Sequence, residues 1–166
     1  MDMNFYRFRS EWTLPAARTD VYLALEQLDD YPLWWKQITR AQQRTNGSYE
    51  MTARSLLPYE LEFVTTQRRC DPVDGILEAD LSGDLGGFSR WTISSAGGIT
   101  TAVFDEEVIA NKALLRRLAY VTRPAFRANH AIMMRDGHRG LQAYLAGWQR
   151  GRGPDPDSIP ESLPSE

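Results

Sequence analysis

The chain has 166 residues, of which 42% are hydrophobic and 25% charged, and its formal net charge is −3. This length suits one domain with its own core, and neither the charge nor any motif indicates a nucleic-acid partner. The N-terminus lacks a charged-then-apolar secretion signal, and no apolar run approaches the roughly 20 residues of a membrane span. We therefore expect a cytoplasmic protein without stable membrane insertion. The single cysteine, Cys70, excludes an internal disulfide and fits an ordinary strand-end residue better than a nucleophile.

The first part of the chain predicts one strand and two helices. Residues 4–14 alternate between aromatic or apolar and charged side chains, which is typical of a half-buried strand. Residues 15–28 are rich in helix formers, and we expect Pro15 to open that helix. A second short helix is expected at residues 32–36, capped by Asp30 or Tyr31. It carries Trp34 and Trp35, of which only one should face the core and the other a pocket rim.

The middle of the chain predicts six strands without intervening helices. Short turns separate residues 38–45, 48–57, 59–70, 76–82, 85–96 and 99–110, and Asn46 followed by Gly47 is the clearest hairpin signal. Consecutive strands joined by tight turns form an antiparallel sheet, because parallel strands need crossover helices. Gly86 and Gly87 predict a bulge or bend.

The C-terminal part predicts a long amphipathic helix at residues 124–148. Its apolar stripe contains aromatic residues, methionines and a single histidine, whereas Arg135, Arg139 and Gln142 lie opposite. Pro124 should break or kink any helix before it. Gly137 and Gly140 each cost about 1 kcal/mol in a helix, which indicates either close packing or cavity space. Residues 151–166 are rich in Pro, Asp and Ser, so we expect a disordered tail after a domain at residues 1–150.

The stretches at residues 12–16 with 21–25, at 30–35 and at 123–130 resemble the START-like helix-grip superfamily, also called SRPBCC proteins, and in particular its polyketide cyclase/dehydrase-type bacterial members. Residues 12–16 with residues 21–25 (WTLPA and VYLAL) resemble the opening strand and helix of that family. Residues 30–35 (DYPLWW) are similar to its Y-P-x-W-W motif, and residues 123–130 (RPAFRANH) look like the start of its closing helix. The resemblance covers roughly residues 4 to 147.

The resemblance implies an α+β helix-grip fold: a curved antiparallel sheet of about seven strands around the long C-terminal helix, with two short helices after the first strand. It also implies a hydrophobic pocket between sheet and helix that binds a lipid, a polyketide or a similar apolar molecule. No cofactor is expected, and the sequence leaves a homodimer open. The expected pocket residues are Trp12, Trp35, Tyr59, Leu61, Phe63, Trp91, Phe104, Phe126, His130, Met133, Met134, Gly137 and Leu141.

Two residues are candidates for chemistry. His130 lies near the centre of the apolar stripe, where it could satisfy a core hydrogen bond or could orient or protonate a ligand carbonyl. Glu106 shares its side of the strand with Phe104 and Val108, so it is the acid most apt to face His130. With two histidines and one cysteine no metal site is expected. Three functions stay open: a binder of an apolar molecule, a polyketide cyclase/aromatase catalysing aldol cyclisation and dehydration, and an interaction module that uses the basic surface of the C-terminal helix.

Overall fold

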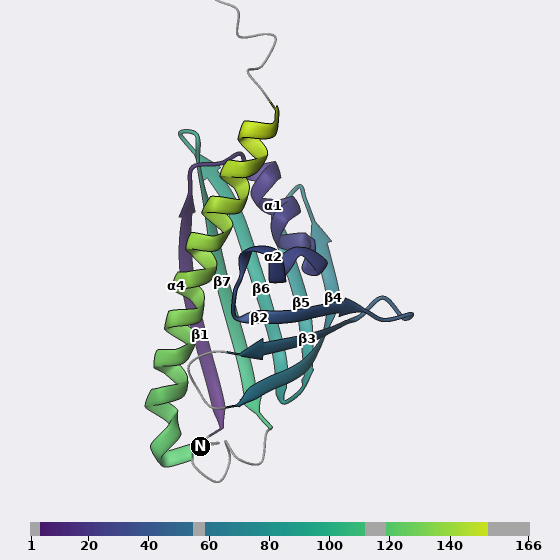
Figure 1. Cartoon of the computed structure of the whole chain (residues 1–166), viewed down its shortest axis with the longest axis vertical. Helices are drawn as coiled ribbons and strands as arrows, with labels where there is room; N and C mark the ends of the chain where they lie inside the picture. The colour runs from purple at the N-terminus through teal and green to yellow at the C-terminus, as the bar shows by residue number, and fades with distance from the viewer. Residues whose placement is uncertain (1–3, 55–58, 112–118, 153–166) are drawn as a thin grey trace, which may run out of the picture.

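The structure is a computed structural model that describes residues 4–54, 59–111 and 119–152 (Figure 1). The first elements are β1 (Phe5–Leu14), α1 (Arg18–Glu26), the 3₁₀ turn η1 (Leu28–Asp30) and the one-turn helix α2 (Tyr31–Trp34). The remaining elements are β2 (Ile38–Gln43), β3 (Tyr49–Arg54), β4 (Glu60–Asp71), β5 (Ile76–Gly83), β6 (Leu85–Ala96), β7 (Ile99–Ala110) and α4 (Ala119–Arg152). Of the disordered tail expected at residues 151–166, residues 151 and 152 belong to α4, and the rest lies outside the described residues.

The seven strands form one antiparallel sheet in the order β1-β7-β6-β5-β4-β3-β2. From β2 to β7, each strand pairs with the next strand in the sequence, as hairpin turns require. Strand β1 pairs with β7 and forms one edge of the sheet. In Figure 1 the strands β2 and β3 run across the view while β1 and β7 run along it, so the sheet curls around α4. The expected fold class, α+β with a helix-grip arrangement, is confirmed.

Two of the glycine signals have different outcomes. At the β2–β3 hairpin the prediction is confirmed: Gly47 has a φ of 83°, and the Asn46 side chain accepts a hydrogen bond from the Ser48 backbone N–H at 3.1 Å. At Gly86 and Gly87 no bulge forms, because the register between β6 and β7 runs through both residues without a shift. Gly87 instead has a φ of 149° and lies so close to the Glu107 carbonyl that no Cβ fits there.

Both proline-based predictions of helix boundaries are wrong. Helix α1 begins at Arg18 rather than Pro15, with Ala17 in the N-cap position. The carbonyl groups before it serve tertiary contacts instead: the Thr100 hydroxyl donates to Ala16 O at 2.6 Å. Helix α4 continues through Pro124, which lies in its interior. Pro124 is the sixth residue of α4, so its missing N–H leaves one helical backbone hydrogen bond unmade.

The two adjacent tryptophans are both buried, contrary to the expectation that one would lie at a rim. Helix α2 ends at Trp34, and Trp35 follows in an extended conformation with a φ of −113° and a ψ of 90°. The helical spacing therefore does not apply to the pair, and the two rings stack with centroids 5.4 Å apart. Trp35 Nε1 donates a hydrogen bond to the Met133 carbonyl of α4 at 2.9 Å, which ties α2 to the long helix.

Helix α4 packs on the concave face through a stripe that agrees with the sequence pattern. Phe126, Met134, Leu141 and Leu145 are buried, and Arg135 and Arg139 are exposed. Gln142 departs from the pattern, because its side chain is half-buried and donates to Thr13 O at 3.3 Å. The N-terminal half of this helix therefore lies over the sheet, where a cavity opens, and its C-terminal half lies against α1 and the end of β1.

Candidate functional site

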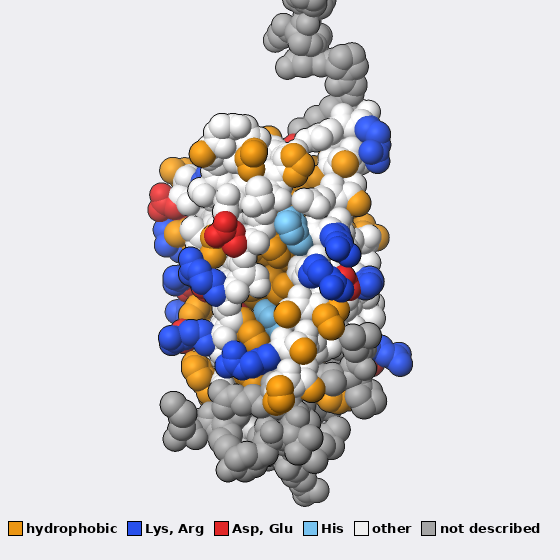
Figure 2. All heavy atoms as spheres, turned by 90° about the vertical axis from the view of Figure 1, so that its left-hand side faces the viewer, with side chains coloured by type: hydrophobic (Ala, Val, Ile, Leu, Met, Phe, Trp, Pro, Cys, Tyr) orange, Lys and Arg blue, Asp and Glu red, His pale blue; other side chains and the backbone are white. Residues whose placement is uncertain are grey.

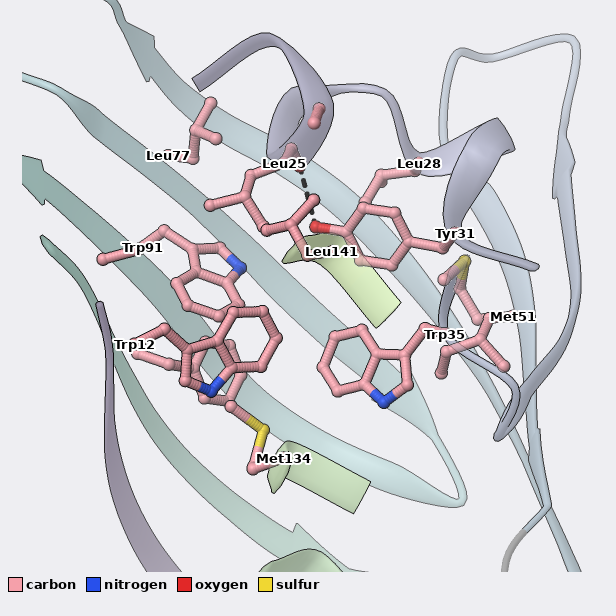
Figure 3. Close-up of a cluster of buried hydrophobic side chains, with 14 of the residues drawn as sticks. Trp12, Leu25, Leu28, Tyr31, Trp35, Met51, Leu77, Trp91, Met134 and Leu141 are labelled. Atoms are coloured by element: carbon pink, nitrogen blue, oxygen red, sulfur yellow. Dashed lines mark hydrogen bonds between the residues drawn. The ribbon is translucent and has the colours of Figure 1, made fainter. Parts of the chain in front are cut away.

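A cavity of about 140 Å³ lies between the concave face of the sheet, α2 and the N-terminal half of α4. Most of its wall is apolar. Trp35 covers it from the position directly after α2, Trp91 and Phe104 contribute from the sheet, and Phe126 and Met133 contribute from α4. Figure 3 shows the packing at this wall, with Trp35 facing Trp12 and Trp91 and with Met134 reaching in from α4. Further lining residues include Leu25, Leu28, Tyr31, Ile38, Met51, Leu77, Leu81 and Leu85.

Nine of the expected pocket residues line this cavity. Alternation along the strands predicts the sheet residues because inward side chains recur at every second position. Helical spacing predicts the α4 residues for the corresponding reason. The nine are Trp35, Leu61, Phe63, Trp91, Phe104, Phe126, His130, Met133 and Met134.

Four expected pocket residues do not line the cavity. Trp12 is buried with an edge-to-face contact to Trp35 at 5.5 Å, so it supports the wall from behind. Gly137 leaves no cavity space, because a Cβ there would lie 2.6 Å from the Trp35 ring. Leu141 is fully buried in the core between α4 and the sheet, and Tyr59 is half-buried against the core. Gly137 thus serves close packing, one of the two alternatives that the sequence left open.

His130 and Glu106 meet at the wall of the cavity. Glu106 is buried in β7, and its Oε2 atom lies 3.2 Å from Nε2 of His130 on α4. The imidazole also stacks on the Phe8 ring of β1, with centroids 3.7 Å apart and an interplanar angle of 10°. A carboxylate and a stacked aromatic face together fix the orientation of the imidazole at the cavity wall.

The other end of the cavity carries a separate hydrogen bond between the two helices that precede β2. The Tyr31 hydroxyl donates to the Leu25 carbonyl at 2.7 Å, as the dashed line in Figure 3 shows. Burial raises the pKa of Tyr31, so this phenol stays protonated at neutral pH. Cys70 lines the cavity nearby, at the end of β4, and desolvation followed by the charge of Glu26 raises its thiol pKa. A raised pKa is the opposite of what a nucleophilic cysteine needs.

The side of the molecule where β1 and α4 lie together is hollowed. Figure 2 shows hydrophobic side chains at the bottom of this hollow, with histidine and basic side chains around it. His138 stacks on Trp12 with centroids 5.6 Å apart, and its Nε2 atom donates to Thr13 O at 2.8 Å. Thus each histidine of α4 rests on an aromatic residue of β1, but His138 lies outside the cavity wall.

Sequence reasoning missed several lining residues. Ser89 shares its side of β6 with Trp91 and lines the cavity, so the alternation that identified Trp91 also identifies Ser89. Asn129 is buried at the wall, and its helical spacing from Phe126 and Met133 was the available signal. Leu25 and Tyr31 come from the two helices before β2, which only the tertiary structure brings over the cavity.

Neither a metal site nor a membrane-spanning helix is found among the described residues. Among residues 4–54, 59–111 and 119–152, no group of three or more His, Cys, Asp or Glu side chains is placed to hold a metal ion. Within the same part of the chain, no helix is both long and apolar enough to cross a membrane.

Solved structures with this architecture are numerous, whereas no family model and no curated protein matches the sequence. The Zhui aromatase/cyclase from Streptomyces sp. R1128 superposes with a TM-score of 0.74 at 10% identity, over 90% of this chain and 98% of that one. A START superfamily protein from Mycobacterium smegmatis gives a TM-score of 0.67 at 12% identity, over 86% and 98%. The chain has the START-like helix-grip fold.

A third helix-grip structure is larger than this chain. The di-domain ARO/CYC StfQ of the steffimycin biosynthetic pathway gives a TM-score of 0.65 at 14% identity, and 90% of this chain covers 53% of it. The chain therefore corresponds to about one half of that protein. At these identities the likeness concerns the fold, and the residues of the cavity must be interpreted from their own chemistry.

Proposed function

We propose that this chain binds an apolar small molecule in the cavity between the sheet and α4. The observation that carries the proposal is the composition of the wall, in which apolar residues, among them tryptophan, phenylalanine, methionine and leucine, outnumber the polar ones. Transfer of apolar surface from water to such a wall is favourable by roughly 25 cal/mol per Å². Small-molecule sites commonly combine an apolar wall with a few well-held polar groups, and the pair of His130 and Glu106 fits that description.

The first test is native mass spectrometry of the purified protein together with organic extraction. We expect an apolar molecule to copurify, or an added apolar fluorophore such as N-phenyl-1-naphthylamine to bind with increased emission. A matched pair of variants on β6 locates the site. Ser89→Phe fills the cavity, whereas Thr92→Phe places the same ring on the exposed face of the same strand.

The Ser89→Phe variant should lose most of the fluorophore binding, and Thr92→Phe should retain it. Overpacking costs roughly 1–3 kcal/mol, so circular dichroism must first establish that both variants are folded. If the two folded variants bind the fluorophore equally well, the ligand does not occupy this cavity and the proposal is wrong.

A second candidate function is supported by the pair of His130 and Glu106: catalysis of aldol cyclisation and dehydration in the manner of an aromatase/cyclase. In such a reaction a base removes a proton next to a carbonyl group, and the resulting carbanion attacks a second carbonyl. The new alkoxide takes up a proton, and water then leaves. His130 is the group that would exchange these protons, and Glu106 would hold it and stabilise its charged form.

His130→Ala tests this candidate with His138→Ala as the matched control, because the second histidine lies on the same helix outside the cavity wall. The expected result is a loss of roughly 10²–10⁴-fold in turnover of a poly-β-keto substrate for His130→Ala only. Equal turnover in the two variants would remove His130 from the mechanism.

A further inference from the structure

A strip of small and polar side chains crosses the sheet wall of the cavity, whose other polar lining residues on β4 and β5 are Thr65, Gln67, Arg69, Cys70 and Glu78. The strand register places Ser89 of β6 directly beside Glu106 of β7, and Ala79 of β5 directly beside Ser89. All three residues line the cavity. Because side chains of paired residues lie on the same face of a sheet, Ser89 and Ala79 leave room in front of the Glu106 carboxylate.

The rows on both sides of this strip contain larger apolar side chains. Phe104, Trp91 and Leu77 are in register on one side, and Val108 and Leu81 belong to the row on the other. Beside Glu106, a ligand in the cavity therefore meets the apolar side chains of Phe104 on one side and Val108 on the other. Glu106 is the polar group at the β7 end of this strip, and His130 reaches it from α4.

The chemistry of Glu106 decides which ligand group fits. An ionised carboxylate only accepts hydrogen bonds, and its contact with His130 involves the Oε2 atom at 3.2 Å. A ligand group in front of Glu106 must therefore donate. A carboxylic acid would be repelled when ionised, and a ketone or ether has no hydrogen to donate. A charged amine would lose its hydration against an apolar wall, which leaves a neutral hydroxyl group as the best match.

The size and aromatic lining of the cavity limit the rest of the ligand. A volume of about 140 Å³ is close to the roughly 150 Å³ of an engineered apolar cavity in another protein that holds benzene. Trp35, Trp91 and Phe104 offer ring faces and edges for stacked or edge-to-face contacts. A phenolic hydroxyl has a pKa near 10, as tyrosine does, and is therefore neutral at physiological pH.

We propose that the cavity selects a single-ring phenol whose hydroxyl group donates a hydrogen bond to Glu106 beside Ser89. This proposal rests on the proposed function, because it names the class of molecule that the apolar cavity binds. It makes Glu106 and Ser89 the residues that determine specificity, and it assigns His130 the role of holding the Glu106 carboxylate in place.

Three ligands with the same methylated ring distinguish the contribution of the hydroxyl group to binding from that of the ring. Isothermal titration of the full chain is carried out with 4-methylphenol, with toluene, which lacks the hydroxyl, and with 4-methylanisole, which accepts but does not donate. We expect 4-methylphenol to bind roughly tenfold to hundredfold more tightly than the other two, the range for a hydrogen bond to a charged group. Equal binding of 4-methylphenol and toluene would overturn the inference while leaving the proposed function intact.

Two variants test whether Glu106 and Ser89 cause the preference for 4-methylphenol, and a variant of a neighbouring carboxylate serves as control. Glu106→Gln and Ser89→Ala should reduce the preference for 4-methylphenol to less than about threefold. Glu107→Gln should leave the preference unchanged, because Glu107 lies next in β7 but pairs with Arg7 on the other face at 2.8 Å. An unchanged preference in both Glu106→Gln and Ser89→Ala would overturn the assignment of this strip.

The wild-type chain provides a readout that does not depend on the folding of any variant. It has only two histidines, so the imidazole signals of His130 and His138 are resolvable by ¹H–¹⁵N NMR. Addition of 4-methylphenol should shift the His130 signals and leave those of His138 in place; the reverse pattern would overturn the proposal. If none of the three ligands binds but N-phenyl-1-naphthylamine does, this inference fails alone. If the fluorophore does not bind either, the proposed function fails with it.

Discussion

Two glycines of α4 make a sharp test of how closely this helix approaches its neighbours. Gly140 lies against the α2 segment: a Cβ built there would fall within bonding distance of the Trp34 carbonyl oxygen and 2.9 Å from its carbonyl carbon. Gly147 is exposed on the same helix, and a Cβ there would have nothing within 4 Å. The two glycine-to-alanine substitutions therefore have the same effect on helix propensity and differ only in the packing around the new Cβ atom.

The expected free energies follow from these environments. Alanine is favoured over glycine inside a helix by about 1 kcal/mol, so Gly147→Ala should stabilise the protein by roughly 0.5–1 kcal/mol. Gly140→Ala gains the same propensity but forces α2 away from α4, and overpacking of this kind costs roughly 1–3 kcal/mol or more when the obstacle is backbone. The net expectation for Gly140→Ala is a loss of about 1–2 kcal/mol. In a protein of this size each 1 kcal/mol shifts Tm by roughly 2–4 °C.

Urea denaturation followed by far-UV circular dichroism measures both changes, and the tryptophan fluorescence of the same samples reports on the α2 contact. The Gly140→Ala variant should have a lower midpoint than wild type at an unchanged slope, and Gly147→Ala a higher one. If Gly140→Ala is as stable as Gly147→Ala, then α2 does not touch α4 at this point. In that case Gly140 does not serve close packing of α4 against α2.

Three further predictions concern residues around the cavity. Asp136 accepts hydrogen bonds from Lys36 and Gln37, which hold its pKa below the ordinary value of 3.8. Its contribution to stability should therefore be present above that value and be lost as the pH falls through the lower folded-state pKa. Asp136→Asn should show a flatter stability curve in this acid range; parallel curves for variant and wild type would contradict the assignment. Tyr31→Phe removes the buried hydrogen bond to Leu25 O and should lower the free energy of unfolding by roughly 1–2 kcal/mol in thermal melts, whereas no change would mean that the bond is not formed. Leu141→Ala, at a fully buried position, should lower the free energy of unfolding by roughly 2–5 kcal/mol and leave fluorophore binding unchanged. A selective loss of fluorophore binding in the folded variant would instead place Leu141 at the site.

The pairing of His130 with Glu106 shows where sequence periodicity is informative. Glu106 shares its strand face with Phe104 and Val108, and His130 shares its helix stripe with Phe126, so both were expected to face inward. Periodicity does not predict which of the inward-facing side chains contact one another, since that depends on how α4 is placed over β7. The contact at 3.2 Å is therefore a property of the tertiary structure, as is the stacking of His130 on Phe8.

Local signals were less informative where other contacts decide the backbone. Pro15 favours a helix start by its ring geometry, yet the Ala16 carbonyl beside it accepts a hydrogen bond from Thr100 and α1 begins three residues later than Pro15. Trp34 and Trp35 were treated as helical neighbours, but α2 ends between them and both rings enter the core. In each case a long-range contact outweighs a local preference of about 1 kcal/mol.

The sequence by itself determined the strand alternation, the hairpin turns and the amphipathic stripe of α4, because these follow from periods of 2 and 3.6 residues along the chain. From them the antiparallel sheet and the inward faces could be derived, whereas the pairing of β1 with β7 was found only in the structure. Only the tertiary structure decided that Gly137 and Gly140 admit Trp35 and the α2 backbone, and that Ser89 and Ala79 leave space before Glu106. The physical reason is that cavities and close contacts depend on the distances between elements, and no local pattern of residues encodes those distances.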